Sequence, residues 1–225
     1  MIHLSSFIVA LLLVSALTIL AEEDVESVTL TSVLQRAAGV YKNFTSPHPD
    51  MKNTVIVTAS NHGYLNHLMN LKCFLDRLNM KFITIAMDEE ANRYLSKRSD
   101  MIIFPKFDGV FGRTAPGATH FRTKEFNIIS FRKVEIVLEI MQRGYHVLFI
   151  DNDVALVADP FPYVLWRNID YVFSVNIFCW DYYGFDIHSY EEGNTGFYYI
   201  RSSNNTIKIY EKALQEFQGW VMMIL

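Results

Sequence analysis

Two aspartates, Asp151 and Asp153, stand one residue apart directly after the apolar run Val147–Ile150. In an extended chain, residues i and i+2 lie on the same side, so both carboxylates can point into one site. Two clustered anions are costly unless a cation neutralises them. Aspartate oxygens suit Mg²⁺ or Mn²⁺, which take water and phosphate oxygens as further ligands. The pair therefore predicts a metal site for a phosphorylated substrate.

The same three residues also fit a simpler interpretation. Asp and Asn are common wherever a strand becomes a turn, so Asp151-Asn152-Asp153 alone describes a solvated turn equally well. However, residues 154–157 are apolar again. Apolar stretches on both sides of the carboxylates favour the metal site, because a solvated turn does not need them.

The elements around this motif alternate between strand and helix patterns. Short apolar, β-branched runs predict strands, and leucines at helical spacing, such as those from Leu65 to Leu78, predict helices. The expected strands are 54–59, 81–86, 101–104, 146–150, 170–176 and 195–201, and the expected helices are 64–78, 88–98, 123–143 and 204–218, the last capped by Asn204 or Asn205. Residues 108–123, rich in Gly and Pro, are expected to form a loop that is open to movement. This order predicts an α/β fold with a mostly parallel sheet.

Ligands of open α/β sheets bind at the carboxyl ends of the strands. Three polar positions are expected there: Ser60 with Asn61, Asp88, and the motif Asp151 to Asp153. Their convergence follows from the predicted layout and from no single motif.

The composition indicates a folded protein and argues against several classes of function. A chain of 225 residues with 51% hydrophobic and 20% charged residues can build a core as one large domain or two small ones. A formal net charge of −4 and the lack of a basic, aromatic-rich cluster argue against nucleic-acid binding. The sequence contains no P-loop, GxGxxG, GxSxG, CxxC or HExxH motif, which removes support for several other enzyme classes.

The N-terminal segment predicts entry into the secretory pathway. Residues 4–21 are nearly all apolar and precede an acidic flank, as in a signal peptide or a signal anchor. We leave both readings open; retention would attach the protein to a membrane. Residues 22–52 are expected to form a polar stem containing a weakly helical stretch, 30–41. Two glycosylation sequons, Asn43-Phe44-Thr45 and Asn204-Asn205-Thr206, agree with a lumenal location.

The chain has only two cysteines, Cys73 and Cys179. An oxidising compartment would let them pair, whereas their apolar neighbours favour buried free thiols. Both alternatives stay open at this level.

Three segments are informative in combination: 55–78 (VIVTASNHGYLNHLMNLKCFLDRL), 133–161 (KVEIVLEIMQRGYHVLFIDNDVALVADPF) and 191–214 (EEGNTGFYYIRSSNNTIKIYEKAL). Together they resemble the nucleotide-diphospho-sugar transferase domain, whose family includes plant arabinosyl- and xylosyltransferases. The resemblance covers roughly residue 54 to the C-terminus, so we expect the domain to span residues 53–225. It implies a GT-A-like, Rossmann-like fold with a metal-binding DXD motif, usually loaded with Mn²⁺. It also implies a UDP-sugar donor, a glycan or glycoprotein acceptor, and residence in the Golgi lumen, as a type II membrane protein, or secretion.

The resemblance also assigns roles to individual positions. Asp151 and Asp153 would be catalytic metal ligands, with Asn152 between them in the substrate site. Ser60 and Asn61 would meet the base and ribose, and Lys133 would meet the donor phosphates, unless it is only a solvated helix lysine. Asn194, as a catalytic residue, with Thr195 and Gly196 would form the floor near the sugar, unless they are an ordinary strand start. Asp181 and, more weakly, Asp186 would meet the acceptor or the transferred sugar.

Family members continue beyond the point where this sequence ends, so we expect the domain to be incomplete at its C-terminal end. The leading hypothesis is a metal-dependent glycosyltransferase. The alternative is a non-catalytic or truncated lumenal relative that binds a nucleotide sugar or a partner protein. A metal-dependent phosphohydrolase, suggested by the aspartates alone, lacks a nucleophile and the ligands of a two-metal centre.

Overall fold

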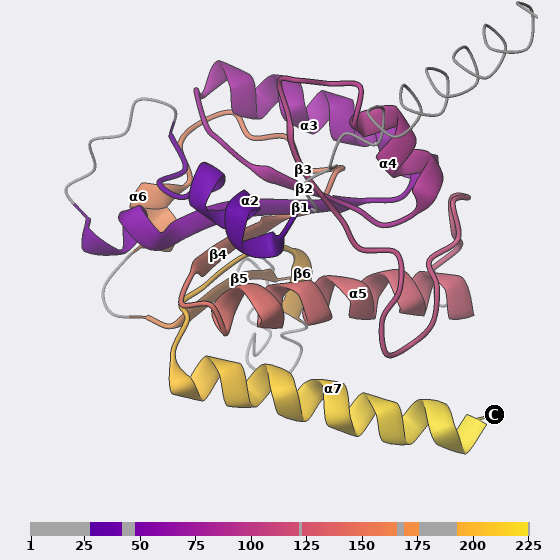
Figure 1. Cartoon of the computed structure of the whole chain (residues 1–225). Coiled ribbons are helices and arrows are strands. Elements are labelled where there is room, and N and C mark those ends of the chain that lie inside the picture. Colours follow the sequence, from indigo (N-terminus) through magenta and orange to yellow (C-terminus); the bar gives the residue numbers. More distant parts are fainter. Residues whose placement is uncertain (1–27, 42–47, 122, 166–168, 176–192, 225) are drawn as a thin grey trace, which may run out of the picture.

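A computed structural model of the chain describes residues 28–41, 48–121, 123–165, 169–175 and 193–224. Its centre is a six-stranded sheet with the order β3-β2-β1-β4-β6-β5 (Figure 1). The strands are β1 Thr54–Ser60, β2 Ile83–Ala86, β3 Ile102–Pro105, β4 His146–Ile150, β5 Tyr171–Val175 and β6 Gly193–Ile200. All seven residues of β1 are buried, since this strand lies in the middle of the sheet.

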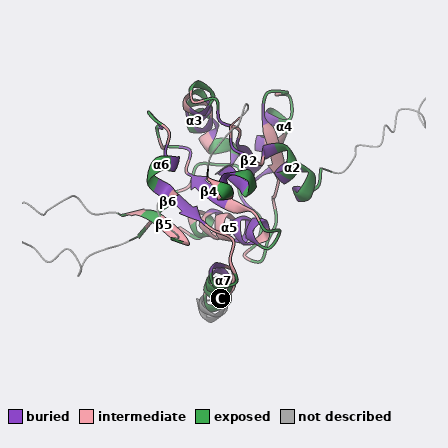
Figure 2. Cartoon of the chain, turned by 90° about the vertical axis from the view of Figure 1, so that its left-hand side faces the viewer, coloured by how far each residue is buried: buried purple, intermediate pink, exposed green. Residues whose placement is uncertain are grey.

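Helices cover both faces of the sheet (Figure 1). On one face lie α3, Leu65–Arg77, and α4, Glu89–Leu95, with the short α6, Phe161–Val164. On the other face lie α2, Leu30–Ala37, and α5, Lys124–Met141, and α7, Asn204–Ile224, packs against α5. Two short 3₁₀ turns, Pro49–Asn53 and His62–Tyr64, precede and follow β1. Figure 2 shows the buried residues concentrated along the sheet and the inner faces of these helices.

The alternation of side chains along β1 divides the core into two layers. Val55 and Val57 pack with the α2 and α5 layer, and Ile56 packs with the α3 and α4 layer. The strand order also reverses at β1: the chain runs outward through β2 and β3, and α5 then returns it to β4 on the other side of β1. This reversal is the place where an open α/β sheet has a crevice between two strand ends.

The expectation of a mostly parallel sheet is confirmed for β1 to β4, which are parallel neighbours. A strand was expected at 195–201 and is present as β6, but its antiparallel direction was not predicted. It pairs with β4 in the register Ile150↔Phe197, so β6 begins where β4 ends. The start of β6 is thereby brought to the carboxyl edge of the parallel strands.

The expected stem, 22–52, is wrong for its C-terminal part. The helix α2 buries Leu30, Val33, Leu34 and Ala37 in the main core, so this helix belongs to the folded domain. Asp50, further along the same segment, accepts a hydrogen bond from the Arg201 guanidinium at 2.5 Å. The domain therefore begins well before residue 53.

Two local expectations also need correction. Ser203, not Asn204 or Asn205, caps α7: the Thr206 N–H donates to Ser203 Oγ at 3.3 Å, and the Ser203 N–H donates to Thr206 Oγ1 at 3.0 Å. Cys73 lies on the exposed face of α3 and not in the core. Cys179 lies outside the described residues.

The expected signal segment, 4–21, and the first sequon also lie outside the described residues. Within the residues that are described, no helix is both long and apolar enough to cross a membrane.

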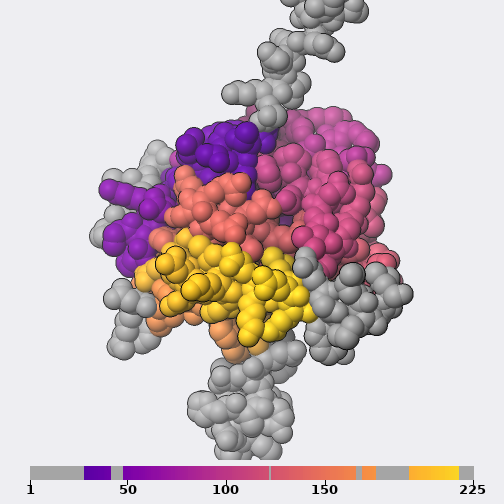
Figure 3. Space-filling model, turned by 60° about the horizontal axis from the view of Figure 1, so that its bottom comes forward, coloured from indigo at the N-terminus to yellow at the C-terminus, as the bar shows by residue number. Residues whose placement is uncertain are grey.

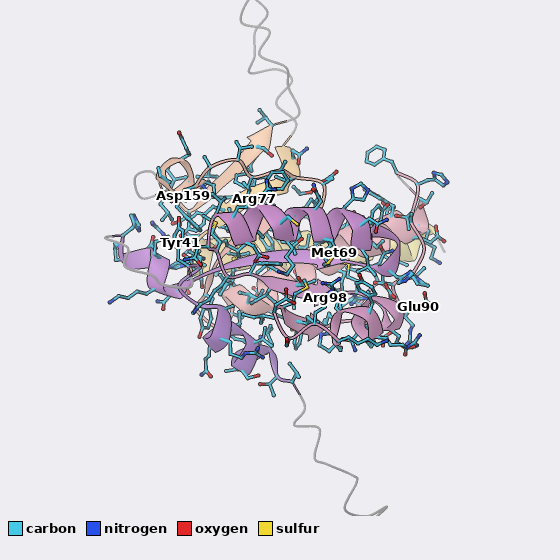
Figure 4. All side chains as sticks on the ribbon, turned by 90° about the horizontal axis from the view of Figure 1, so that it is seen from above. Tyr41, Met69, Arg77, Glu90, Arg98 and Asp159 are labelled. Atoms are coloured by element: carbon cyan, nitrogen blue, oxygen red, sulfur yellow. The ribbon has the colours of Figure 1, made fainter. Side chains whose placement is uncertain are left out.

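Figure 4, a view onto α3, gives the orientation of the domain. Arg77, in the last turn of α3, lies toward the end of the molecule that also carries Tyr41 and Asp159. Glu90, in the first turn of α4, lies at the opposite end, where the parallel strands finish. The carboxyl edge of the sheet is therefore at the Glu90 end of this view.

Candidate functional site

A pocket of about 210 Å³ opens at the carboxyl ends of β1 and β4, where the strand order reverses. Its walls come from five parts of the chain: the end of β1, the start of α3, the loop before α5, α5 itself and the turn after β4. The lining residues are Ala59, Asn61, Tyr64, His67, Thr119, Phe126, Ile129, Lys133, Asp151, Asn152 and Asp153. The structure therefore brings together Asn61, Lys133 and the aspartate motif, which are far apart in the sequence.

Asp151 is the first residue after β4 and is held from two sides. Its N–H donates to the Gly196 carbonyl at 2.7 Å, which extends the β4–β6 pairing by one step. Its Oδ1 accepts a hydrogen bond from Lys133 Nζ at 2.5 Å. The side chains of Lys133 and Asp151 are 20% and 25% exposed, so the ion pair is partly shielded from water and opens onto the pocket.

Lys133 reaches this position from the middle of α5. Its ammonium also lies over the ring of Phe149, 5.7 Å from the ring centre. The interpretation of Lys133 as a freely solvated helix lysine is therefore wrong, because its ammonium pairs with Asp151 and lies over the ring of Phe149.

Asn152 points away from the open part of the site. Its Oδ1 accepts a hydrogen bond from Thr58 Oγ1 at 2.6 Å, and its Nδ2 donates to the Ala59 carbonyl at 3.0 Å. The side chain is buried and bridges the ends of β1 and β4. Asn152 thus fixes the turn that carries the two aspartates.

Asp153 is exposed at the pocket rim, next to the more shielded Asp151. Within the described residues, no cluster of three or more His, Cys, Asp or Glu side chains is placed to hold a metal ion. Two carboxylates at an open pocket nevertheless fit Mg²⁺ or Mn²⁺, because such ions commonly bind one or two carboxylates and complete their coordination with water and phosphate oxygens. The donor set fits a metal that is shared with a phosphorylated ligand.

Asn61 fastens the pocket to the loop before α5. Its Nδ2 donates to the carbonyls of Ala115 at 2.9 Å and Gly117 at 2.7 Å, which fixes the orientation of the amide. Its Oδ1 is buried and has no hydrogen-bond partner among the residues that the structure describes. An unsatisfied buried acceptor in a pocket wall is uncommon and is a candidate contact for a ligand N–H or O–H group.

The loop 108–121 was expected to be open to movement, but many contacts hold it. The Tyr64 hydroxyl donates to the Thr119 carbonyl at 3.0 Å, and the Gly63 N–H donates to the Pro116 carbonyl at 2.7 Å. A Cβ at Gly63 would collide with the backbone of Ala118, so only glycine permits this close approach.

A buried ion pair on α5, which was not expected from the sequence, anchors the start of the loop. Arg132 Nη1 donates to Glu135 Oε2 at 2.7 Å, and Glu135 Oε1 accepts the Val110 N–H at 2.9 Å. Arg132 also donates to the Gly112 carbonyl and is only 1% exposed. Both residues looked like ordinary helix charges, since their i,i+3 spacing also occurs on solvated helices.

The first residues of β6 lie beside Asp151, although none of them lines the pocket. The Gly196 N–H donates to Asn194 Oδ1 at 2.6 Å. A Cβ at Gly196 would lie 2.8 Å from that oxygen and 3.3 Å from Asp151 Oδ2, so a side chain has no room there. Thr195 is exposed, and Asp181 and Asp186 lie outside the described residues.

Two further candidates lie just behind the pocket. Ser60 is buried, and its hydroxyl donates to the Asn61 carbonyl at 2.9 Å. Asp88 accepts the His62 N–H at 2.7 Å and caps α4 through the N–H groups of Glu90 and Ala91. Neither residue lines the pocket, and both brace the segments that do.

Figure 3, which brings the bottom of the molecule forward, shows α7 in yellow lying across this face beside the residues of α5. Phe217 of α7 stacks on Phe131 of α5, and Phe111 from the loop packs edge-on against Phe217, with 5.2 Å between ring centres. The helix α7 therefore supports the loop that forms one wall of the pocket.

The chain is similar to a known protein family and to several curated proteins. The family model for nucleotide-diphospho-sugar transferases matches residues 78–220. Among curated proteins, the chain is 27% identical over 173 residues to an uncharacterised Arabidopsis thaliana protein, covering 71% of this chain and 49% of that protein. No solved structure matches the chain.

Two further relatives have names that state an activity. The beta-arabinofuranosyltransferase RAY1 of Arabidopsis thaliana is 28% identical over 174 residues, 74% of this chain and 30% of that protein. The UDP-galactose:fucoside alpha-3-galactosyltransferase of Dictyostelium discoideum is 26% identical over 190 residues, 72% of this chain and 28% of that protein. The chain thus spans about half or less of the length of these curated relatives. The match over more than half of the sequence shows that the chain belongs to the nucleotide-diphospho-sugar transferase family.

Proposed function

We propose that this protein transfers a sugar from a UDP-sugar to a glycan or glycoprotein acceptor, with Mn²⁺ or Mg²⁺ held by Asp151 and Asp153. One observation carries the proposal: Asp151, Asp153 and Lys133 meet at one pocket where the strand order reverses. Membership of the family supports sugar transfer, and the names of two relatives point to the same chemistry.

The chain's own groups suit a diphosphate. Lys133 supplies a positive charge, and Asp151 and Asp153 supply oxygen ligands on the same side of the pocket. A bound divalent ion would stabilise the negative charge that develops on the departing diphosphate. Asn152 keeps both carboxylates in place from beneath through its bonds to Thr58 and Ala59.

The opposite wall suits a nucleoside. The free acceptor Asn61 Oδ1 would take the N–H of a uracil ring, and Thr119 Oγ1, which is also buried without a partner, would meet a hydroxyl group. Tyr64 and Phe126 add aromatic surface on the same side. UDP as the nucleotide is further supported by the name of the Dictyostelium relative.

The start of β6, beside Asp151, suits the transferred sugar. Asn194 and Gly196 lie next to the carboxylate, and the missing side chain at Gly196 lets the Asn194 amide come close to Asp151, where it could bind a sugar hydroxyl. We assign Asn194 to the catalytic set on this basis. Thr195, whose side chain lies on the exposed side, would contact substrate only at the rim.

We also propose that the protein works in the lumen of the secretory pathway. The apolar segment 4–21 and the two sequons support this location. Fusion of residues 1–27 to a reporter enzyme, followed by fractionation and endoglycosidase treatment, tests the proposal; a reporter that stays cytosolic and unglycosylated would refute it.

The reaction itself is tested by a donor screen. Purified protein is incubated with Mn²⁺ and a panel of UDP-pentoses and UDP-hexoses, and released UDP is measured. We expect release from at least one donor, reduced at least about a hundredfold in Asp153→Asn, as expected for the loss of a group that stabilises the leaving group. Equal release by the wild type and Asp153→Asn would exclude the proposed role of the motif.

A further inference from the structure

Asp151 meets its counter-ion inside the protein. Lys133 Nζ lies 2.5 Å from Asp151 Oδ1, and both side chains are three-quarters or more shielded from solvent. At this distance and burial the attraction is far stronger than in water. A cation that binds Asp151 must therefore compete with the Lys133 ammonium.

Charge counting gives the consequence of this competition. With Lys133 in place, one net negative charge of Asp151 and Asp153 remains to attract a divalent ion; without Lys133, both charges would remain. Among the described residues no third acidic, His or Cys ligand joins these two to offset the loss. Asn152 does not help, because both ends of its amide are already bonded to Thr58 and Ala59.

A diphosphate changes this balance. Its oxygens bring additional negative charge and additional metal ligands, and they offer the ammonium of Lys133 a new partner. The Phe149 ring, over which the Lys133 ammonium lies, stabilises the positive charge in addition to Asp151. The lysine therefore opposes the metal alone and favours the metal together with the diphosphate.

We propose that Lys133 makes metal binding depend on the nucleoside diphosphate, so that the site fills with both ligands together and stays largely free of metal otherwise. This inference rests on the proposed function and adds a coupling between its two ligands. Such coupling is reciprocal: if UDP strengthens Mn²⁺ binding, Mn²⁺ strengthens UDP binding by the same factor.

The test is a titration of Mn²⁺ in which free Mn²⁺ is measured by electron paramagnetic resonance, with and without saturating UDP. In Lys133→Met, which keeps the length and packing of the side chain, we expect Mn²⁺ alone to bind about tenfold more tightly than in the wild type, and the enhancement by UDP to shrink by about the same factor. Lys133→Gln, also neutral, should behave in the same way, and Lys133→Arg should keep the wild-type coupling.

The ion pair between Lys106, just after β3, and Glu139 of α5 provides a matched control. Lys106 Nζ lies 2.5 Å from Glu139 Oε1, with similar exposure, but neither residue lines the pocket. Lys106→Met should leave the binding of Mn²⁺ unchanged, with and without UDP. Thermal unfolding of each variant establishes that the fold is intact.

The outcomes separate the coupling from the proposed function. If the wild type binds Mn²⁺ with UDP, but folded Lys133→Met and Lys133→Gln gain no affinity for Mn²⁺ alone, the coupling role of Lys133 is wrong and the proposed function stands. If the wild type binds neither Mn²⁺ nor UDP under any combination, both the proposed function and this inference fail. A gain of Mn²⁺ affinity on loss of a positive charge supports the coupling, because structural damage does not produce it.

Discussion

The carbonyl of Gly196, on β6, accepts a hydrogen bond at 2.7 Å from the N–H of Asp151, the first residue after the antiparallel neighbour β4. This contact joins the start of β6 to the end of β4. It thereby fixes the first aspartate of the motif against Gly196.

The absence of a side chain at Gly196 should be essential to this contact between β6 and Asp151. In Gly196→Ala, the new methyl group would lie 2.8 Å from Asn194 Oδ1 and 3.3 Å from Asp151 Oδ2, so the amide must move. We expect a loss of about 1–3 kcal/mol in the free energy of unfolding, as for overpacking, and weaker binding of UDP with Mn²⁺. Urea unfolding measures the loss of stability, and calorimetry measures the binding of UDP with Mn²⁺. Gly117→Ala, whose methyl group would enter open space, is the control; equal effects in the two variants would contradict the steric explanation.

Asn152 should contribute more to stability than to ligand contact. Asn152→Ala leaves the buried Thr58 hydroxyl and the Ala59 carbonyl without their partner, which should lower the free energy of unfolding by about 2–3 kcal/mol. In the double variant with Thr58→Val, part of this loss should disappear, because the unsatisfied hydroxyl is removed. Strictly additive losses in urea unfolding would show that the two side chains do not interact.

Removal of one partner of the buried ion pair Arg132–Glu135 should strongly lower the free energy of unfolding. Arg132→Met leaves the Glu135 carboxylate buried without its cation, and we expect a loss of about 3–5 kcal/mol. Arg113→Met, on the same loop, breaks the exposed ion pair between Arg113 and Glu89 of α4 and should cost at most about 1 kcal/mol. Chemical denaturation of Arg132→Met and Arg113→Met measures the two losses in the free energy of unfolding. Because the loop carries Ala115 and Gly117 to Asn61, Arg132→Met should also weaken UDP binding.

The sequence predicted the strands and helices of the parallel half well, since each has a clear hydrophobic period between turn signals. The motif at Asp151 and the position of Asn61 also followed from it, because both stand where a buried strand ends. The boundaries were less exact: the helix expected at 88–98 ends at Leu95. Ends of this kind depend on capping contacts that periodicity does not encode.

The remaining features depend on contacts between distant segments. The direction of β6 is set by its pairing with β4, and nothing within residues 195–201 distinguishes a parallel from an antiparallel strand. The burial of Arg132 depends on the loop folding over it, and the ion pair of Lys133 depends on the angle at which α5 crosses β4. The helix α2 was assigned to a stem because the segment 22–52 as a whole is polar, although the apolar face of this helix is buried.

Stability should fall in mild acid because of His146. Burial chiefly lowers the pKa of His146, and nearby Arg201 lowers it further, while Asp50 and Asp170 oppose these effects and the more distant His48 adds to them. The unfolded chain therefore takes up this proton more readily than the folded one. The contribution of His146 to the free energy of unfolding is complete above a pH of about 6.5. It is lost as the pH falls through the lower pKa that His146 has in the folded state.

Substitution of this histidine tests the pH effect. His146 Nδ1 accepts the Ser202 N–H at 2.9 Å, and an Asn side chain can offer an acceptor without titrating. Urea unfolding of the wild type between pH 7.5 and 5.0 should show a steeper loss of stability than unfolding of His146→Asn. Identical slopes in the two proteins would rule out His146 as the source.

The most direct test of the central claim is the calorimetric titration of UDP into the wild type and into the double variant Asp151→Asn, Asp153→Asn, each with Mn²⁺ and with a chelator. The wild type should bind UDP with Mn²⁺ and lose most of the affinity with the chelator, and the double variant should bind weakly in both conditions. If UDP binds equally well with the chelator, or if the double variant binds as the wild type does, then Asp151 and Asp153 do not hold a metal–diphosphate complex.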